Sequence, residues 1–525
     1  MFNTLIIPLN KSPVSLLIIC NKKNRRPGSA PGYPSMKKES VIVIGAGFSG
    51  LSAASTLARE GLDVTLLEKN SMAGGRARKF SANGFIFDMG PSWYWMPDIF
   101  EEYFASFGRK VSDYYQLDRL NPSYKIYFGP GDEVVLPASL EGIYALYESI
   151  EPGSTPALKK FLEESEYKYR IGIGEFVRKP SHSIGEYLHW KIFAAGMKLN
   201  MLSSFGDYTR RYFKSEKINR MLEFPVLFLG GTAKSTPALY SLMNYSDMVQ
   251  GTWYPRGGMY RVVEGMEALA AELGVRFVYD SEVKSLNTSG GKVVSVSTAT
   301  REFNAGYVIA AADYHHVEQQ LLPENARRYT QKYWDSRVLS PSSLIFYLGF
   351  DTRIQRLDHH TLLFDEDFAG HADSIYKNPE WPEKPSVYIS CTSKTDDTVA
   401  PEGHENVMVL IPVAPGLKDT PEIREKYLEH VLMRMERYTG QSLRGHLVYQ
   451  RSYAHADFES DYHAFKGNAY GLANTLMQTA FLKPKVRNNK LSNLFYAGQL
   501  TVPGPGVPPA IISGQIAANE IIKQL

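Results

Sequence analysis

A glycine-rich segment near residue 45 carries the strongest chemical signal in the sequence. Its residues are Gly45, Ala46, Gly47, Phe48, Ser49 and Gly50, and it lies between a β-branched run at 40–44 and a helical stretch at 51–60. Gly45 permits a tight turn, Gly47 lets the backbone approach a pyrophosphate, and Gly50 allows the helix to pack closely on the strand. Free N–H groups at the helix N-terminus favour the phosphate charge. The pattern predicts a dinucleotide-binding βαβ unit.

The second strand of this unit is predicted at 64–67 and ends at Glu68. A carboxylate at this point accepts hydrogen bonds from ribose hydroxyls, and its charge disfavours a 2′-phosphate. We assign Glu68, and Lys69 directly after it, to the same binding site.

Two further segments indicate which dinucleotide is bound. The glycine pair before an arginine, Gly74-Gly75-Arg76, resembles the FAD-binding flavoproteins of the amine-oxidase type. The resemblance implies that Gly75 lies against the cofactor and that the Arg76 guanidinium donates near its phosphates. Gly90, Pro91 and Ser92 follow where such proteins run a loop past the flavin.

The C-terminal end resembles the closing flavin-binding segment of the same superfamily. A hydrophobic strand at 494–496 leads through a Gly/Pro loop into a helix predicted at 510–523. By this resemblance, Gly498, Gln499 and Val507 contact the cofactor, and the helix N-terminus points at the reduced flavin ring. The superfamily has Gly-Asp where this chain has Gly498-Gln499, although a glutamine also forms hydrogen bonds.

Together with Trp253–Met259, these segments are similar to the carotenoid desaturases of the bacterial phytoene desaturase type. The resemblance implies an α/β fold with a Rossmann-like FAD-binding domain, in which Val283 meets the adenine edge. This domain is predicted to be discontinuous, with segments 36–110, 255–315 and 488–525. An inserted α+β domain, 111–254 and 316–487, would face the substrate and the membrane.

The resemblance also implies the chemistry. A hydride passes from an allylic carbon to flavin N5, and a proton leaves the neighbouring carbon. The predicted substrate is a long apolar polyene, phytoene desaturated stepwise toward lycopene, held by the shape of an apolar tunnel. Catalytic residues are not assigned, because Pro152-Gly153 is not followed by the Asp and Arg proposed for the family. Oxygen and a quinone both remain open as the electron acceptor.

Two other functions share these motifs. A carotenoid isomerase, or a desaturase of another polyene, would have the same cofactor segments. Escort proteins of the same architecture bind prenyl groups without redox chemistry. The intact segment from Gly45 to Glu68 with Gly75-Arg76 favours a working cofactor site.

A stripe of Leu188, Ile192, Ala195, Leu199 and Leu202 has helical spacing. It is consistent with a core helix or with an interfacial helix that dips into a bilayer. No run after Met36 is long and apolar enough to span a membrane. Since the implied substrate resides in lipid, we expect a cytoplasmic protein attached peripherally to the membrane.

Composition excludes other classes. The 525 residues include 58 Lys+Arg and 55 Asp+Glu, which gives no indication of nucleic-acid binding. Residues 1–35 contain basic but no acidic residues, and we interpret them as an extension outside the fold. The two cysteines are too few for a disulfide framework. The adjacent pairs His315-His316 and His359-His360 have no carboxylate at ligand spacing, so we expect core or surface histidines and no metal site.

Overall fold

The structure is a computed structural model that describes residues 39–187, 203–227 and 231–525. The predicted stripe from Leu188 to Leu202 lies outside the described residues. Among those that are described, no helix is long and apolar enough to cross a membrane.

A parallel five-stranded sheet carries the dinucleotide motif. Its order is β19-β13-β1-β2-β9, and every neighbouring pair runs parallel. The strands are β1 (Ser40–Ile44), β2 (Asp63–Leu67), β9 (Arg276–Val278), β13 (Tyr307–Ala310) and β19 (Leu494–Tyr496). A short β-branched run such as β1 is buried by neighbours on both faces, as is typical of parallel sheets. The predicted α/β fold class is confirmed, whereas the domain boundaries remain a prediction.

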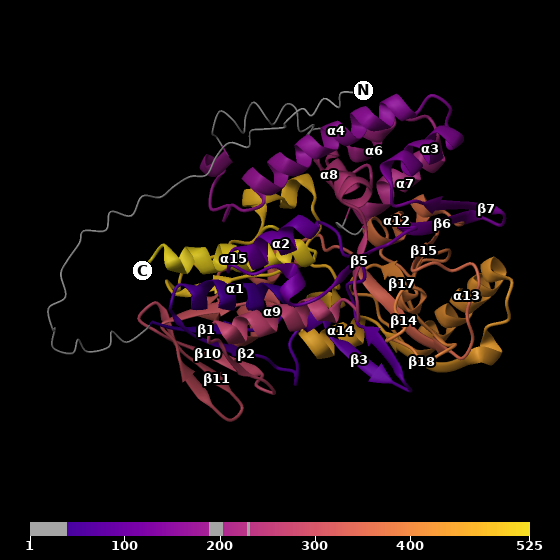
Figure 1. The fold of residues 1–525 in the computed structure, drawn as a ribbon. Coiled ribbons are helices and arrows are strands. Elements are labelled where there is room, and N and C mark those ends of the chain that lie inside the picture. The colour runs from indigo at the N-terminus through magenta and orange to yellow at the C-terminus, as the bar shows by residue number, and fades with distance from the viewer. Residues whose placement is uncertain (1–38, 188–202, 228–230) are drawn as a thin grey trace, which may run out of the picture. The chain divides into compact units, whose positions relative to one another are not determined.

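The helices α1 (Phe48–Arg59) and α15 (Val507–Ile522) pack against each other beside this sheet (Figure 1). The two helices approach closely because Gly514 has no side chain. A Cβ at this position would lie 2.2 Å from the carbonyl oxygen of Ser49. The Ser52 hydroxyl donates to the carbonyl of Ile511 at 2.7 Å. The first and last helices of the described chain therefore form one joint support for the motif.

Helix α9 and an antiparallel three-stranded sheet complete this part of the fold. Their bounds are α9 (Tyr260–Glu272), β10 (Val283–Ser289), β11 (Lys292–Thr298) and β12 (Glu302–Asn304). Gly290 and Gly291 connect β10 to β11 in a hairpin turn, both with positive φ.

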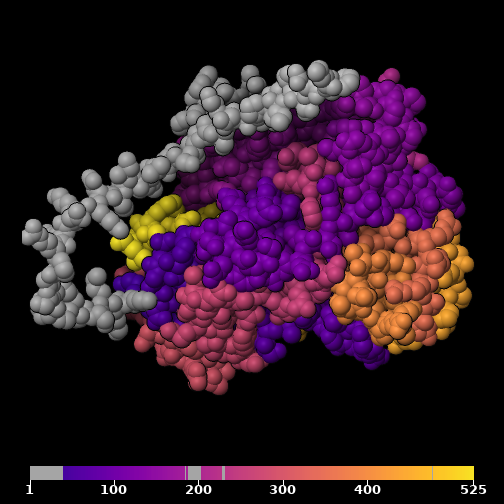
Figure 2. Space-filling model, viewed as in Figure 1, coloured from indigo at the N-terminus to yellow at the C-terminus, as the bar shows by residue number. Residues whose placement is uncertain are grey.

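A second, seven-stranded sheet is built mainly from the second half of the chain. Its order is β18-β14-β17-β16-β15-β6-β7. The strands are β6 (Tyr124–Gly129), β7 (Asp132–Leu136), β14 (Ser342–Phe350), β15 (His360–Leu363), β16 (Val387–Ser390), β17 (Glu405–Val413) and β18 (Leu447–Tyr453). Helix α13 (Pro421–Thr439) contributes Leu428, Val431 and Met435 to a core shared with these strands. The later segments form a continuous orange block on the face shown in Figure 2.

The remaining elements are mainly helical. The longer ones are α2 (Pro97–Ala105), α3 (Leu140–Ile150), α4 (Thr155–Ile171), α7 (Glu216–Leu227), α12 (Phe368–Tyr376) and α14 (His455–Tyr462). The short ones are α6 (Phe205–Thr209), α8 (Leu242–Tyr245), α10 (Tyr314–His316), α11 (Gln331–Asp335), β3 (Lys79–Ala82), β4 (Phe85–Asp88), β5 (Leu117–Arg119) and β8 (Trp253–Pro255).

Candidate functional site

One large cavity gathers nearly all the predicted cofactor residues. Its empty volume is about 2790 Å³, including its open mouth. Every predicted cofactor residue except Ala46 and Gly50 lines it. The lining ones are Gly45, Gly47, Phe48, Ser49, Glu68, Lys69, Gly75, Arg76, Gly90, Pro91, Ser92, Val283, Gly498, Gln499 and Val507. Segments more than 400 residues apart in the sequence therefore meet around one space.

The glycines of the first motif shape the polar end of this cavity. A Cβ on Gly47 would meet no atom within 4 Å, so the backbone there faces open space. A Cβ on Gly50 would lie 1.8 Å from the carbonyl oxygen of Gly45, so Gly50 serves helix–strand packing. Helix α1 begins after Gly47 with no capping side chain. An uncapped helix N-terminus beside a bare backbone fits a pyrophosphate.

Glu68 also braces this end of the cavity from within the protein. Its Oε2 accepts the Ala46 N–H at 2.7 Å, and its Oε1 accepts from the Asn70 N–H at 2.9 Å. The carboxylate thus ties the glycine loop to the end of β2, a contact that the spacing alone did not predict. The predicted contact of Glu68 with ribose hydroxyls remains a prediction.

Arg76 is a partly buried cation on the same wall. Its Nε has no hydrogen-bond partner among the described residues, and its Nη2 donates to the Asn468 carbonyl at 3.3 Å. Burial lowers the pKa of this guanidinium, while the nearby Asp313 carboxylate opposes that shift. The Gln499 side-chain amide can be oriented so that its nitrogen donates to the Ala469 carbonyl. In this orientation the amide oxygen of Gln499 accepts from Nη2 of Arg76 at 3.1 Å. A partly buried guanidinium whose Nε is buried with no partner among the described residues fits a phosphate-bearing ligand.

The C-terminal segment closes the cavity with backbone geometry. The Gly498 N–H donates to the Ser513 hydroxyl at 2.9 Å, and that hydroxyl donates to the Val502 carbonyl at 2.7 Å. Helix α15 begins at Val507, three residues earlier than predicted, because Pro508 and Pro509 suit its first turn. Its uncapped N-terminus lines the cavity, as does that of α1.

Away from these polar groups the cavity wall becomes apolar. The residues that share this character come from several elements, and they include Trp93, Trp95, Ile173, Val177, Leu242, Met243, Ile345 and Leu410. Trp93 and Trp95 directly follow the predicted loop at Gly90–Ser92, whereas the others belong to no recognisable motif. Strands such as β14 and β17 are buried almost throughout, and their apolar runs do not distinguish a cavity wall from a core.

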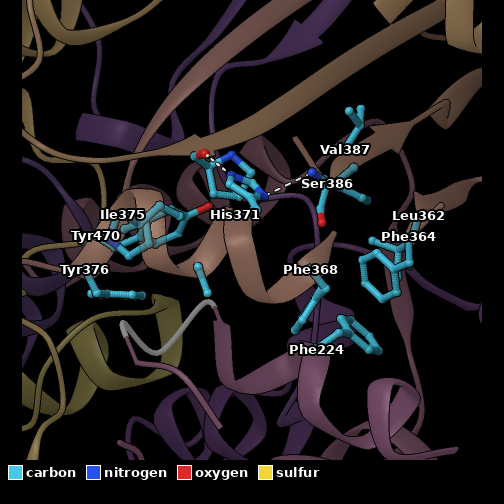
Figure 3. A pocket seen from close by; sticks show the side chains of 14 residues that line it. Phe224, Leu362, Phe364, Phe368, His371, Ile375, Tyr376, Ser386, Val387 and Tyr470 are labelled. Atoms are coloured by element: carbon cyan, nitrogen blue, oxygen red, sulfur yellow. Dashed lines mark hydrogen bonds between the residues drawn. The ribbon is translucent and has the colours of Figure 1, made fainter. Parts of the chain in front are cut away.

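A second cavity of about 610 Å³ adjoins the first, and we call it the apolar chamber. Tyr388 and Tyr470 line both spaces. No Asp, Glu, Lys or Arg is present among the chamber's described lining residues, which are Phe224, Pro341, Leu362, Phe364, Phe368, His371, Ala372, Ile375, Tyr376, Ser386, Val387, Tyr388, Pro412 and Tyr470. Figure 3 shows aromatic and aliphatic side chains arranged around it.

His371 is the only imidazole in the described lining of the chamber, and it is held neutral. Its Nδ1 accepts the Ser386 N–H at 3.0 Å, which leaves Nε2–H to donate to the Pro412 carbonyl at 2.8 Å (Figure 3). Burial lowers the pKa of His371 to about 4. The chamber therefore presents no charge at neutral pH and suits a hydrocarbon.

A hydrogen-bonded chain lies where the two cavities meet. The Tyr388 hydroxyl donates to the Ser92 hydroxyl at 2.8 Å, and it is also 2.8 Å from Nδ1 of His360. Ser92 is a predicted cofactor residue, whereas we interpreted His360 only as a core or surface histidine. His360 is fully buried, as a core histidine would be. Nothing in the sequence indicated its hydrogen bond to Tyr388 in the cavity wall.

Comparison with known proteins gives the same cofactor and chemistry. The family described as flavin containing amine oxidoreductase matches residues 48–522. A carotenoid 3,4-desaturase of Haloarcula japonica is 40% identical over 490 residues, 93% of this chain and 99% of the relative. A 4,4'-diapophytoene desaturase of Staphylococcus aureus is 30% identical over 92% of this chain and 99% of its own length.

Solved structures agree on the fold. An oxidoreductase from Methanosarcina mazei has a TM-score of 0.59 at 15% identity and covers 92% of this chain and 100% of its own. At that identity the likeness concerns the fold alone.

Proposed function

Because the chain belongs to the FAD-dependent carotenoid desaturases of the flavin containing amine oxidoreductase family, we propose that it desaturates phytoene, or a closely similar acyclic polyene, stepwise toward lycopene. It is an FAD-dependent oxidoreductase that acts on CH–CH bonds. When bound, FAD supplies the two-electron oxidation by accepting a hydride. The site residues described above would hold its pyrophosphate and ribose at the polar end.

The observation that carries the proposed substrate is the uncharged lining of the apolar chamber. A hydrocarbon offers no group for hydrogen bonding, so only shape and apolar contact can select it. An apolar cavity wall leading to a chamber without a described charged residue supports such a substrate. A substrate with a charged end group would leave that charge unpaired in the chamber, at a cost of several kcal/mol.

The test is expression of the chain beside a pathway that makes phytoene, with pigments separated by chromatography. We expect phytoene to decrease and lycopene, with partly desaturated intermediates, to accumulate. Conversion only of a more desaturated precursor would instead assign the 3,4-desaturation named for the Haloarcula relative. A change in double-bond geometry without loss of hydrogen would assign an isomerase, and unchanged polyenes with retained prenyl binding would assign an escort-like protein.

We further propose peripheral attachment to a membrane, because a C40 hydrocarbon resides in lipid and must enter the apolar chamber from there. Purified protein should co-sediment with liposomes. Replacement of Leu188, Ile192 and Leu199 by Ser should weaken sedimentation and leave the flavin spectrum intact. If this variant loses flavin, the stripe belongs to the core.

The electron acceptor can be assigned in the same liposomes. Anaerobic turnover restored by a quinone would identify a quinone as acceptor. Turnover that requires air and produces hydrogen peroxide would identify oxygen.

A further inference from the structure

The desaturation proposed above requires a proton acceptor, and motif analysis supplied none. Removal of hydrogen from two neighbouring carbons releases one hydride and one proton. The hydride carries both electrons of its C–H bond, so the second hydrogen must leave as a proton to another group. That group must lie in the cavity wall where the polyene meets the cofactor.

The carboxylates in the described cavity wall are engaged at the polar end. Glu68 accepts the Ala46 N–H, and Asp313 accepts the His316 N–H and faces Arg76. Asp461 accepts from Arg78 at 2.6 Å, and Glu282 from His463 at 2.9 Å. None of these four lines the apolar chamber.

The structure assigns this role to the chain Ser92–Tyr388–His360: we propose that Ser92 takes up the substrate proton and that Tyr388 and His360 relay it away. Ser92 lines the large cavity, and Tyr388 on β16 lines both cavities. His360, at the start of β15, lies behind them with no exposed surface. Both links of the chain measure 2.8 Å, within normal hydrogen-bond length.

The chain can carry a proton in this direction because its polarity is reversible. When Tyr388 donates to Ser92, Nδ1–H of His360 donates to Tyr388. Hydroxyl hydrogens rotate, so the same two distances also allow Ser92 to donate to Tyr388 and Tyr388 to donate to a bare Nδ1. In this second arrangement a lone pair of Ser92 is free to face the cavity.

The proton balance follows from the second arrangement. A substrate C–H bond breaks, and its electron pair becomes the second bond of the new C=C as a hydride leaves the adjacent carbon, which FAD would accept when bound. The released proton binds Ser92 Oγ. The former Ser92 proton moves to Tyr388 Oη, and the Tyr388 proton moves to Nδ1 of His360, which becomes an imidazolium.

The surroundings of His360 suit a transient proton carrier. Burial and the adjacent His359 lower the pKa of His360, so it starts neutral and holds a proton at Nδ1 only briefly. Its ring stacks on Trp93 with centroids 4.0 Å apart and planes 17° apart. An aromatic face stabilises a cation, which offsets part of the cost of the buried charge. Nε2 of His360 has no hydrogen-bond partner among the described residues, so the relay ends there. The imidazolium is short-lived: its proton leaves by the same hydrogen bonds and is taken up when the electron acceptor, oxygen or a quinone, is reduced.

The test uses the full-length holoenzyme in liposomes containing phytoene, without air, and follows the loss of flavin absorption in a single turnover. Tyr388→Phe, which removes the central hydroxyl, should slow this reduction by about 100-fold or more. Ser92→Ala should slow it, whereas Ser92→Thr, which keeps a hydroxyl, should restore most of the rate. The control is Tyr438→Phe on α13, whose ring packs on Tyr127 and lines neither cavity.

A second measurement separates proton removal from a structural effect. Phytoene deuterated at the carbons that lose protons should show a larger isotope effect in Tyr388→Phe and His360→Gln than in the wild type. FAD content and the reduction potential of the flavin should be unchanged.

The relay would be overturned if Tyr388→Phe and His360→Gln reduced their flavin at the wild-type rate. It would also be overturned if all the variants of Ser92, Tyr388 and His360 lost FAD. If none of the acyclic carotenes reduced the flavin of the wild-type enzyme, the proposed function would be overturned instead.

Discussion

The two ends of the ligand space are specified in different ways. The polar end is formed by backbone geometry at a few glycines and by helix N-termini, which require particular residues at fixed spacing. The apolar end is formed by side chains from β14, β15, β16, β17 and α12, where many apolar residues serve equally well. A site that binds phosphates therefore leaves a readable motif, whereas a site that binds hydrocarbon leaves only hydrophobic periodicity.

The largest expected effect comes from adding a side chain at the polar end. Gly47→Val should abolish FAD binding, because its branched side chain would occupy the open space along which the pyrophosphate must lie. The fold should persist, since that space contains no protein atom within 4 Å of the new Cβ. Flavin absorption and circular dichroism of the purified variant measure the two properties.

Two glycines provide matched controls for this variant. Gly445→Val, at an exposed position that is equally open, should keep its flavin. Gly50→Val should lose both flavin and fold, because its Cβ would overlap the Gly45 carbonyl. A flavin-bound Gly47→Val would show that the pyrophosphate lies elsewhere.

The same contrast determines how much the sequence could predict. The strand β1 lies where its β-branched run predicts it, because a buried parallel strand requires that composition. Helix α1 begins at Phe48 rather than residue 51, because the motif residues themselves form the first helical turn. The short strand β12 was not predicted, since three residues carry no periodicity.

The cofactor residues could be predicted from the sequence, whereas the residues of the proposed relay could not. The cofactor residues could be chosen because turn geometry and phosphate charge restrict residue type locally. Tyr388 and His360 are 28 residues apart and meet only through the pairing of β15 with β16. Nothing in the sequence around the histidine pair indicates that partner, so their link required the fold.

At the apolar end, filling the chamber should affect turnover and spare the cofactor. Ala372 lies on α12 and lines the chamber, so Ala372→Phe would occupy space that the polyene needs. We expect a loss of phytoene conversion of about 10- to 100-fold, because the polyene is misplaced, with unchanged FAD content. Chromatographic product analysis and the flavin spectrum test both halves of the prediction.

Ala369→Phe provides the control on the same helix, because Ala369 is exposed and lines neither cavity. It should convert phytoene normally. Equal conversion by both variants would show that the chamber does not hold the substrate.

A milder effect is expected from Glu68→Gln at the polar end. The amide loses the negative charge and one of the acceptor contacts that tie the glycine loop to β2. Hydrogen bonds to a charged group are worth about 1.5–3 kcal/mol, so FAD affinity should fall about 10- to 100-fold. Titration of deflavinated protein with FAD measures the change.

The control is Asp63→Asn, at the start of the strand that ends before Glu68. It removes a surface ion pair with Arg276 on β9 and should leave FAD affinity unchanged. If Glu68→Gln binds FAD as tightly as the wild type, the bracing contact is not needed for cofactor binding.

The smallest expected effect concerns the neutral histidine of the chamber and depends on pH. The pKa of His371 in the folded protein is about 4, below the ordinary value of 6.5. The unfolded chain therefore binds a proton first as the pH falls, and stability is lost between pH 6.5 and pH 4. At pH 5.5 this single group should cost about 1.4 kcal/mol, a tenfold change in the unfolding equilibrium.

His371→Gln removes this titration and can keep a donor for the Pro412 carbonyl. The other buried histidines titrate equally in both proteins, so the difference between the two proteins isolates His371. Urea unfolding at pH 7.5 and pH 5.5 should show a smaller loss of stability in the variant. Equal losses would mean that the chamber already admits a charged imidazole, and the distinction between a charged and an uncharged end of the ligand space would then fail at this residue.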